Sequence, residues 1–112
     1  MEFESRESFR VESENFASFR VFDSEEQVVG EGVVTINDIS RTGIAFSTKT
    51  AVETGLKIEL AIGVGDEIVK TLGRIRNQKT GDKDSFQVGV EFDFLSDEDL
   101  DKLATVYPDI NK

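Results

Sequence analysis

The residues best suited to chemistry in this chain of 112 residues are two arginines, Arg6 and Arg10, which lie four residues apart. A guanidinium group is planar and permanently charged, and its N–H donors form a fixed fork that can hold a phosphate group through two parallel hydrogen bonds. The pair therefore predicts recognition of a small anion. Five glutamates among residues 2–14 leave a second interpretation open, in which the arginines only form ion pairs in water.

A second pattern, Asp-x-Ser-x-x-Gly, comprises Asp38, Ser40 and Gly43 at the end of a predicted strand. The aspartate and serine supply a carboxylate and a hydroxyl, and the glycine suits a turn with positive φ or a close approach of the backbone. The same residues also suit a local turn in which both side chains satisfy only neighbouring backbone groups. Each pattern alone is short enough to occur by chance, so the prediction of a binding site depends on whether the fold brings the two patterns together.

The composition argues against several other classes of site. The chain has no histidine and no cysteine, so it lacks the most common metal ligands and catalytic base, and we expect no metal site, no cofactor and no enzymatic activity. The net charge of −10 opposes binding to DNA or RNA, and no apolar run is long enough for membrane insertion. The acidic start lacks the basic and apolar regions of a signal peptide, which predicts a cytoplasmic protein.

Strands must position most of these residues. Hydrophobic side chains at every second position predict strands at 56–62 and 86–94, each with one face on a core. Glycine-rich segments at 63–66 and 80–83 predict hairpin loops. Shorter runs of aromatic and β-branched residues predict four more strands, at 16–22, 32–39, 44–47 and 67–77.

The end of the chain changes to a helical pattern. Ser96 is a favourable N-cap, and acidic residues follow it where a helix N-terminus favours negative charge. Leu100, Leu103 and Tyr107 lie on one stripe, as in a short amphipathic helix packed on a sheet.

Together these elements predict an all-β domain. Antiparallel strands joined by hairpins favour a closed or nearly closed barrel, with the helix against one opening or one side. We place a six-stranded antiparallel β-barrel and its short C-terminal α-helix at residues 16–112. Residues 1–15, rich in charge and serine, are expected to form a mobile N-terminal arm that carries the RxxxR pair.

The order of these features resembles the PilZ domain, a bacterial receptor module for the second messenger cyclic di-GMP. The resemblance rests on the RxxxR pair, the DxSxxG pattern, a Gly-Val-Glu-Phe strand at 89–92 and the short helix that follows. Many members carry a further basic residue directly before the RxxxR pair, where this chain has Ser5, so the number of ligands per site stays open. The resemblance implies a six-stranded antiparallel barrel and a cyclic di-GMP site at Arg6, Arg10, Asp38, Ser40 and Gly43.

The chemistry of cyclic di-GMP fits these residues. Each guanine offers O6 and N7 as acceptors to an arginine, whereas its N1–H and N2–H₂ donors suit the Asp38 carboxylate. Asp38 and Ser40 have the same parity in their strand, so we expect them to point the same way. Gly89, on the polar face of its strand, would leave room for a flat base. We interpret three later arginines as surface residues or ion-pair partners, although one of them, Arg76, could reach the site from a neighbouring strand.

The resemblance implies a cyclic di-GMP receptor whose N-terminal arm becomes ordered on ligand binding. The bound form would then signal to a downstream protein partner in motility, exopolysaccharide production or attachment. The alternative is a protein-interaction module of the same fold that binds no nucleotide, since some PilZ members have lost ligand binding. The two differ in a measurable way, because a ligand of the native state raises its melting temperature.

Overall fold

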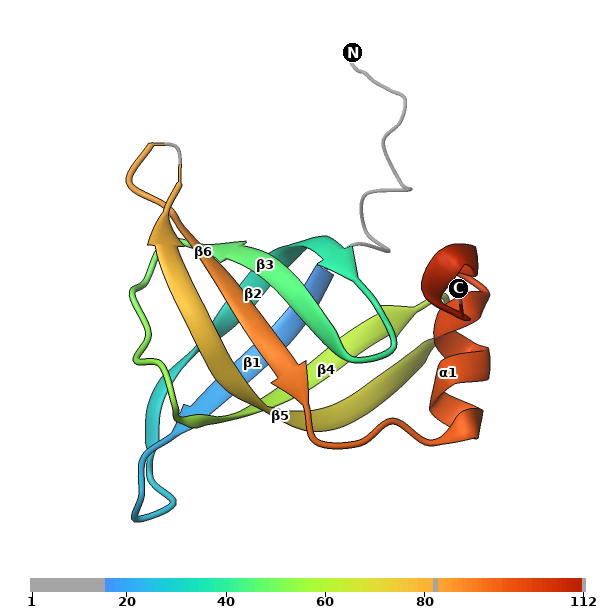
Figure 1. Cartoon of the computed structure of the whole chain (residues 1–112), viewed down its shortest axis with the longest axis horizontal. Coiled ribbons are helices and arrows are strands. Elements are labelled where there is room, and N and C mark those ends of the chain that lie inside the picture. Colours follow the sequence, from blue (N-terminus) through green and yellow to red (C-terminus); the bar gives the residue numbers. More distant parts are fainter. Residues whose placement is uncertain (1–15, 82, 112) are drawn as a thin grey trace.

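The chain folds into a closed barrel of six antiparallel strands, with one short α-helix near its C-terminal end (Figure 1). The computed structural model describes residues 16–81 and 83–111. Around the barrel the strands are hydrogen-bonded in the order β1-β2-β3-β6-β5-β4, and β4 closes the barrel on β1. The predicted fold class is confirmed. The strands are β1 Phe16–Phe22, β2 Val28–Ile39, β3 Gly43–Thr48, β4 Lys57–Val64, β5 Glu67–Thr80 and β6 Phe86–Phe92.

Alternating hydrophobic side chains fill the interior of the barrel. Along β4, Ile58, Leu60 and Ile62 are fully buried, whereas the residues between them are partly exposed. Phe46 of β3 is also fully buried, and its ring stacks against that of Phe19 on β1 with the centroids 5.7 Å apart. One face of each strand therefore builds the core, and the other face stays available for solvent or a ligand.

Two strands differ in length from the prediction. β2 begins at Val28 rather than at residue 32, since it pairs with β1 along nearly the whole hairpin. β6 ends at Phe92 rather than at residue 94, although the Asp93 N–H still donates to the Leu72 carbonyl of β5. The Phe94 side chain is 75% exposed. The prediction that Phe94 faces the core is therefore wrong: the alternating sequence continues past the end of the sheet.

The helix begins where the sequence predicts. Ser96 is the N-cap of α1, Asp97–Ala104, and its Oγ accepts a hydrogen bond from the Asp99 N–H at 3.0 Å. This bond satisfies one of the backbone donors that a helix N-terminus leaves without an intrahelical partner. Leu100 and Leu103 are buried, so one side of α1 packs on the core as its apolar stripe predicts.

The segment after α1 also packs on the core, through Val106, Tyr107 and Ile110. Tyr107 packs against the core from the turn before the 3-10 helix η2, Pro108–Asn111, so it does not extend the helical stripe as predicted. Lys102 Nζ of α1 lies 3.2 Å from Glu67 Oε1 at the start of β5. The hydrogen bond from Lys102 to Glu67 and the negative charge of Glu67 both raise the pKa of Lys102.

None of the described helices is long and apolar enough to cross a lipid bilayer.

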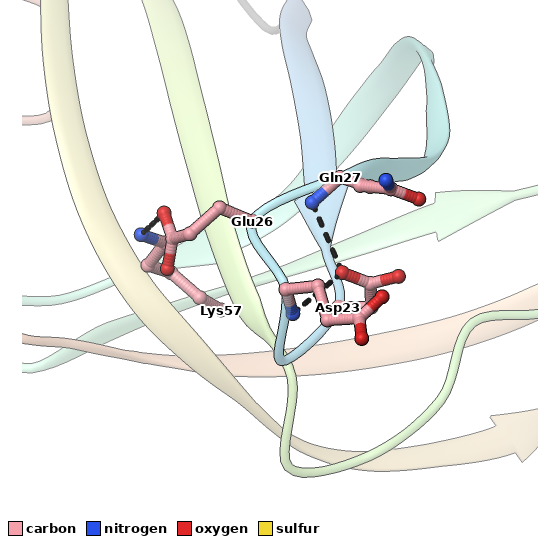
Figure 2. Close-up of polar contacts among 5 residues, drawn as sticks. Asp23, Glu26, Gln27 and Lys57 are labelled. Carbon is pink, nitrogen blue, oxygen red and sulfur yellow. Dashed lines mark hydrogen bonds and ion pairs between the residues drawn. The ribbon is translucent and has the colours of Figure 1, made fainter.

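The Asp23 carboxylate stabilises the turn between β1 and β2 (Figure 2). Asp23 Oδ1 accepts hydrogen bonds from the backbone N–H groups of Glu25 at 2.8 Å and Gln27 at 3.0 Å. Within the same turn, Glu26 has φ 65°, and its carboxylate lies 2.6 Å from Lys57 Nζ. Asp23 therefore uses its negative charge on its own backbone, which is a common role of aspartate in turns.

Candidate functional site

The DxSxxG residues lie where β2, β3, β6 and β5 are neighbours in the barrel wall (Figure 1). One row of directly paired residues crosses all four strands, in the order Asp38, Ala45, Gly89, Asn77. The central pair, Ala45 and Gly89, carries at most a methyl group and forms a flat floor with a polar residue at each end. Because neighbouring strands lie about 4.8 Å apart, the row spans about 14 Å, more than the width of a purine base.

A β-bulge interrupts the strand pairing at each end of this row. The register of β2 against β3 shifts just before Asp38, so Asn37 has no directly paired residue. The register of β5 against β6 shifts just before Asn77, which leaves Arg76 without a directly paired residue. Both bulges expose two consecutive polar residues. Since bulges re-aim side chains and recur beside binding sites, they bring additional polar groups to the two ends of the floor.

Around the row the surface is hollowed into an open depression of about 440 Å³. Asp38, Ser40 and Gly43 line one side of it, and Arg76 and Glu91 lie among the residues that β5 and β6 contribute. Among the described lining residues, two carry carboxylates and one carries a guanidinium. This part of the depression is therefore net negative, and an anionic ligand would need further positive charge from elsewhere in the chain.

Ser40 holds the turn between β2 and β3. Its N–H donates to the Gly43 carbonyl at 2.8 Å, and its Oγ accepts from the Thr42 N–H at 3.3 Å. The Ser40 hydroxyl therefore satisfies a neighbouring backbone group, as in a local turn, and its role toward a ligand stays a prediction. Strand parity does not relate Ser40 to Asp38, because Ser40 lies just beyond the end of β2. The turn, rather than the strand, brings the serine to the depression.

Gly43 is required by a close approach of two strands. A Cβ at this position would clash with the carbonyl oxygen of Val90 on β6. The described glycines with positive φ are Gly55 and Gly65, so of the two reasons that the sequence offers for Gly43, the structure selects close packing. Any side chain here would push β3 away from β6 at the edge of the depression.

Asp38 differs from both of these turn residues. It is exposed, it lines the depression, and its carboxylate forms no hydrogen bond or ion pair with any other residue between 16 and 81 or between 83 and 111. The local-turn interpretation is therefore not observed for Asp38 within that part of the chain. An ionised carboxylate without a local partner is available to accept hydrogen bonds from a ligand.

The side chain of Asn77 covers Gly89. A Cβ at Gly89 would lie 2.8 Å from Asn77 Oδ1 and 3.0 Å from Nδ2. An amide thus occupies the space over Gly89 that was predicted to admit a flat base. The Asn77 amide forms no hydrogen bond within the described residues, so it can turn toward a ligand that enters the depression.

Arg76 and Glu91 form an ion pair that lines the depression. Arg76 Nε donates to Glu91 Oε1 at 2.6 Å, and the two side chains are 57% and 54% exposed. Arg76 was predicted to be a surface residue or an ion-pair partner, and this is confirmed. Arg76 also lines the depression, in agreement with the other prediction, that it could reach the site from a neighbouring strand. Arg74, also on β5, instead donates from Nη1 to the Gly55 carbonyl at 3.0 Å.

The structure brings three of the five predicted ligand residues, Asp38, Ser40 and Gly43, to one depression. The other two, Arg6 and Arg10, lie outside the described residues.

The sequence did not identify Asn77 and Glu91 as lining residues. A signal for Asn77 was available: the alternation of β5 breaks after Ile75, where two polar residues follow one another, and β5 continues to Thr80 rather than ending at 77. Within the described part of the chain, no group of three or more acidic, histidine or cysteine side chains gathers as a metal site requires.

Known proteins are similar to this chain over nearly its whole length. The PilZ domain family model matches residues 4–107. The structure of K. pneumonia MrkH in its apo state has a TM-score of 0.61 and 18% sequence identity, with 96% of this chain and 52% of MrkH covered. The 2.65 Å P2(1) crystal of K. pneumonia MrkH has a TM-score of 0.62 and 16% identity, with 99% and 51% covered. At this identity the likeness concerns the fold, and the chain spans about half the length of MrkH. No curated protein matches the chain.

Proposed function

This chain belongs to the PilZ domain family, whose members are ligand-binding receptor modules, and from that premise we propose that it binds cyclic di-GMP and signals to a downstream protein partner. The proposal includes ordering of the N-terminal arm on binding and an output in motility, exopolysaccharide production or attachment. It involves no catalytic step. The proposed ligand residues are Arg6, Arg10, Asp38, Ser40 and Gly43.

The observation that carries this proposal is the Asp38 carboxylate, which has no partner among the described residues and lies beside the floor of Ala45 and Gly89. Guanine has two donors on one edge, N1–H and N2–H₂, and an ionised carboxylate can accept from both. The floor has no side chain larger than a methyl group, so a planar base can approach the backbone once the Asn77 amide turns aside.

Charge explains why both sequence patterns are needed. The described lining residues carry two carboxylates against one guanidinium, which already pairs with Glu91. This arrangement alone would repel the two phosphodiester charges of cyclic di-GMP. Arg6 and Arg10 would supply two positive charges, and each can bind a phosphate or a guanine edge through two hydrogen bonds.

The magnitudes are consistent with a receptor. Micromolar affinity corresponds to about 8 kcal/mol of binding free energy. Each bidentate arginine–guanine pair contributes about 1–3 kcal/mol of discrimination between bases, and hydrogen bonds to a charged group contribute about 1.5–3 kcal/mol each. Two arginines and Asp38 therefore supply much of the required free energy, less the free energy spent on ordering the arm.

Isothermal titration of the full chain with cyclic di-GMP tests the proposal. We expect the wild-type protein to bind and its melting temperature to rise with ligand concentration. Arg10→Ala should weaken binding about 10–100-fold, because it removes one bidentate contact. Arg20→Ala is the matched control, since it removes the same charge from β1, where Arg20 Nη2 pairs with Glu59 Oε1 at 3.0 Å.

Two results would contradict the proposal at different levels. Unchanged affinity in Arg10→Ala would mean that the ligand binds without the predicted arginine. No binding heat, together with no change in melting temperature at saturating cyclic di-GMP, would support the interaction module that binds no nucleotide.

A further inference from the structure

Arg76 is the one cation among the described residues that line the depression. It contacts Glu91 through Nε only. A guanidinium has five N–H donors, and those on Nη1 and Nη2 form no hydrogen bond with any residue that the structure describes. Among the described residues, most of the hydrogen-bonding capacity of Arg76 is therefore unused.

The position of the pair follows from strand geometry. Arg76 is the unpaired residue of the β5 bulge, directly before Asn77 at the end of the floor. Glu91 follows Gly89 by two residues along β6, so both are on the same face, about 7 Å apart along the strand. The ion pair thus lies at the border of the floor, within reach of a ligand that covers it.

The Arg76–Glu91 pair is weak enough to be exchanged. Both side chains are more than half exposed. Ion pairs at such exposure are screened by water and salt and contribute little to stability. A phosphodiester offers an arginine two oxygens that match its planar fork, which a single Nε contact to a carboxylate does not. An entering phosphate can therefore replace Glu91 as the partner of Arg76.

We propose that Arg76 is a third ligand-binding arginine that Glu91 holds in the ligand-free protein, and that cyclic di-GMP displaces Glu91 to reach it. This inference rests on the function proposed above for the same depression. Glu91 then acts as a built-in competitor: it occupies a cation that the ligand needs, and its own negative charge opposes the arriving phosphate. The ion pair sets the affinity of the receptor.

Titration of full-length variants with cyclic di-GMP tests this role. Glu91→Gln keeps the size of the side chain but removes its charge, so we expect binding to become about 3–10-fold tighter. Arg76→Ala should weaken binding about 10-fold or more, as expected for loss of a bidentate contact. Arg20→Ala and Glu59→Gln alter an ion pair of the same type between β1 and β4, and should change the affinity less than 2-fold.

The double variant Arg76→Ala/Glu91→Gln isolates the coupling. If Glu91 competes for Arg76, the gain from Glu91→Gln must be smaller when Arg76 is absent. An equal gain in both backgrounds would mean that Glu91 only repels the ligand, and this would overturn the exchange mechanism. Melting temperatures of the ligand-free variants establish that each is folded.

The remaining outcomes separate the inference from the proposed function. If the wild-type protein binds cyclic di-GMP but Glu91→Gln binds no tighter, or Arg76→Ala binds equally well, the inference is wrong and the receptor function stands. If neither the wild-type protein nor Glu91→Gln binds, the proposed function fails and the inference fails with it.

Discussion

One aspartate lies in the turn before β2 and another lies beside the turn after it, and the two side chains have different roles. Asp23, in the β1–β2 turn, accepts hydrogen bonds from two backbone N–H groups (Figure 2). Asp38, next to the β2–β3 turn, accepts none from the described residues. The β2–β3 turn is instead held by the hydroxyl of Ser40 and the close packing of Gly43. An aspartate near a turn is thus available for a ligand only where other residues stabilise that turn.

The largest expected effect tests whether packing at Gly43 holds the second turn. Gly43→Ala places a methyl group against the Val90 carbonyl oxygen, so β3 and β6 must separate. We expect the free energy of unfolding to fall by about 3 kcal/mol, measured by urea denaturation. Gly63→Ala is the control, because the nearest atom to its new methyl group is the Phe16 carbonyl oxygen at 3.9 Å. Equal losses in the two variants would contradict the structural role of Gly43.

The next effect concerns the carboxylate that the turn does not use. Asp38→Ala should weaken cyclic di-GMP binding by about 2 kcal/mol, roughly 30-fold, because it removes hydrogen bonds to a charged acceptor. The free energy of unfolding should change by less than about 0.5 kcal/mol, since Asp38 has no partner among the described residues. Calorimetric titration and urea denaturation measure the two quantities. A loss of stability without a loss of affinity would make Asp38 a turn residue.

Asp23→Ala should give the opposite result. Two backbone N–H groups of the β1–β2 turn lose their acceptor, so we expect the free energy of unfolding to fall by about 1 kcal/mol. The affinity for cyclic di-GMP should stay at the wild-type value, as Asp23 lies in a different turn. Asp38→Ala should thus lower the affinity but not the stability, and Asp23→Ala the stability but not the affinity. Equal effects of the two variants on either quantity would contradict the different roles of the two aspartates.

The smallest effect is expected at Ser40. Its Oγ lies 3.3 Å from the Thr42 nitrogen and 3.4 Å from the Gly43 oxygen, which is long for hydrogen bonds. Ser40→Ala should therefore reduce the free energy of unfolding by only about 0.5 kcal/mol. Ser40→Thr, which keeps the hydroxyl, serves as the control in the same urea experiment. A loss of several kcal/mol in the alanine variant would mean that the Ser40 hydroxyl contributes more to the stability of this turn than the packing of Gly43 does.

The sequence predicted those features that depend on local pattern. The alternation in β4 and β6 located the core, and Ser96 marked the start of α1. The features that it missed depend on pairing between distant strands. Nothing local to Phe94 reveals that β6 ends at Phe92. Two consecutive polar residues mark the position of the bulge at Arg76, but only the register of β5 against β6 shows it to be a bulge.

The candidate site divides along the same line. The DxSxxG residues were predictable because their types and spacing form a short pattern. The sequence also singled out Gly89 and Arg76, but not their neighbours: that Ala45 continues the floor and that Glu91 pairs with Arg76 follows only from placing the strands side by side. A pattern in sequence therefore located one half of the described site, and cross-strand register supplied the other.

Closure of the barrel restricts how a signal can leave this molecule. Every strand has two neighbours, including β1, which pairs with both β2 and β4. Some strands nevertheless extend beyond one neighbour: residues 28–34 of β2 pair with β1 but not with β3. Within the described residues, a partner could therefore extend the sheet by β-augmentation only along such short segments. Over the rest of the barrel wall, recognition must use side chains and turns, the same kinds of surface that the proposed ligand would rearrange.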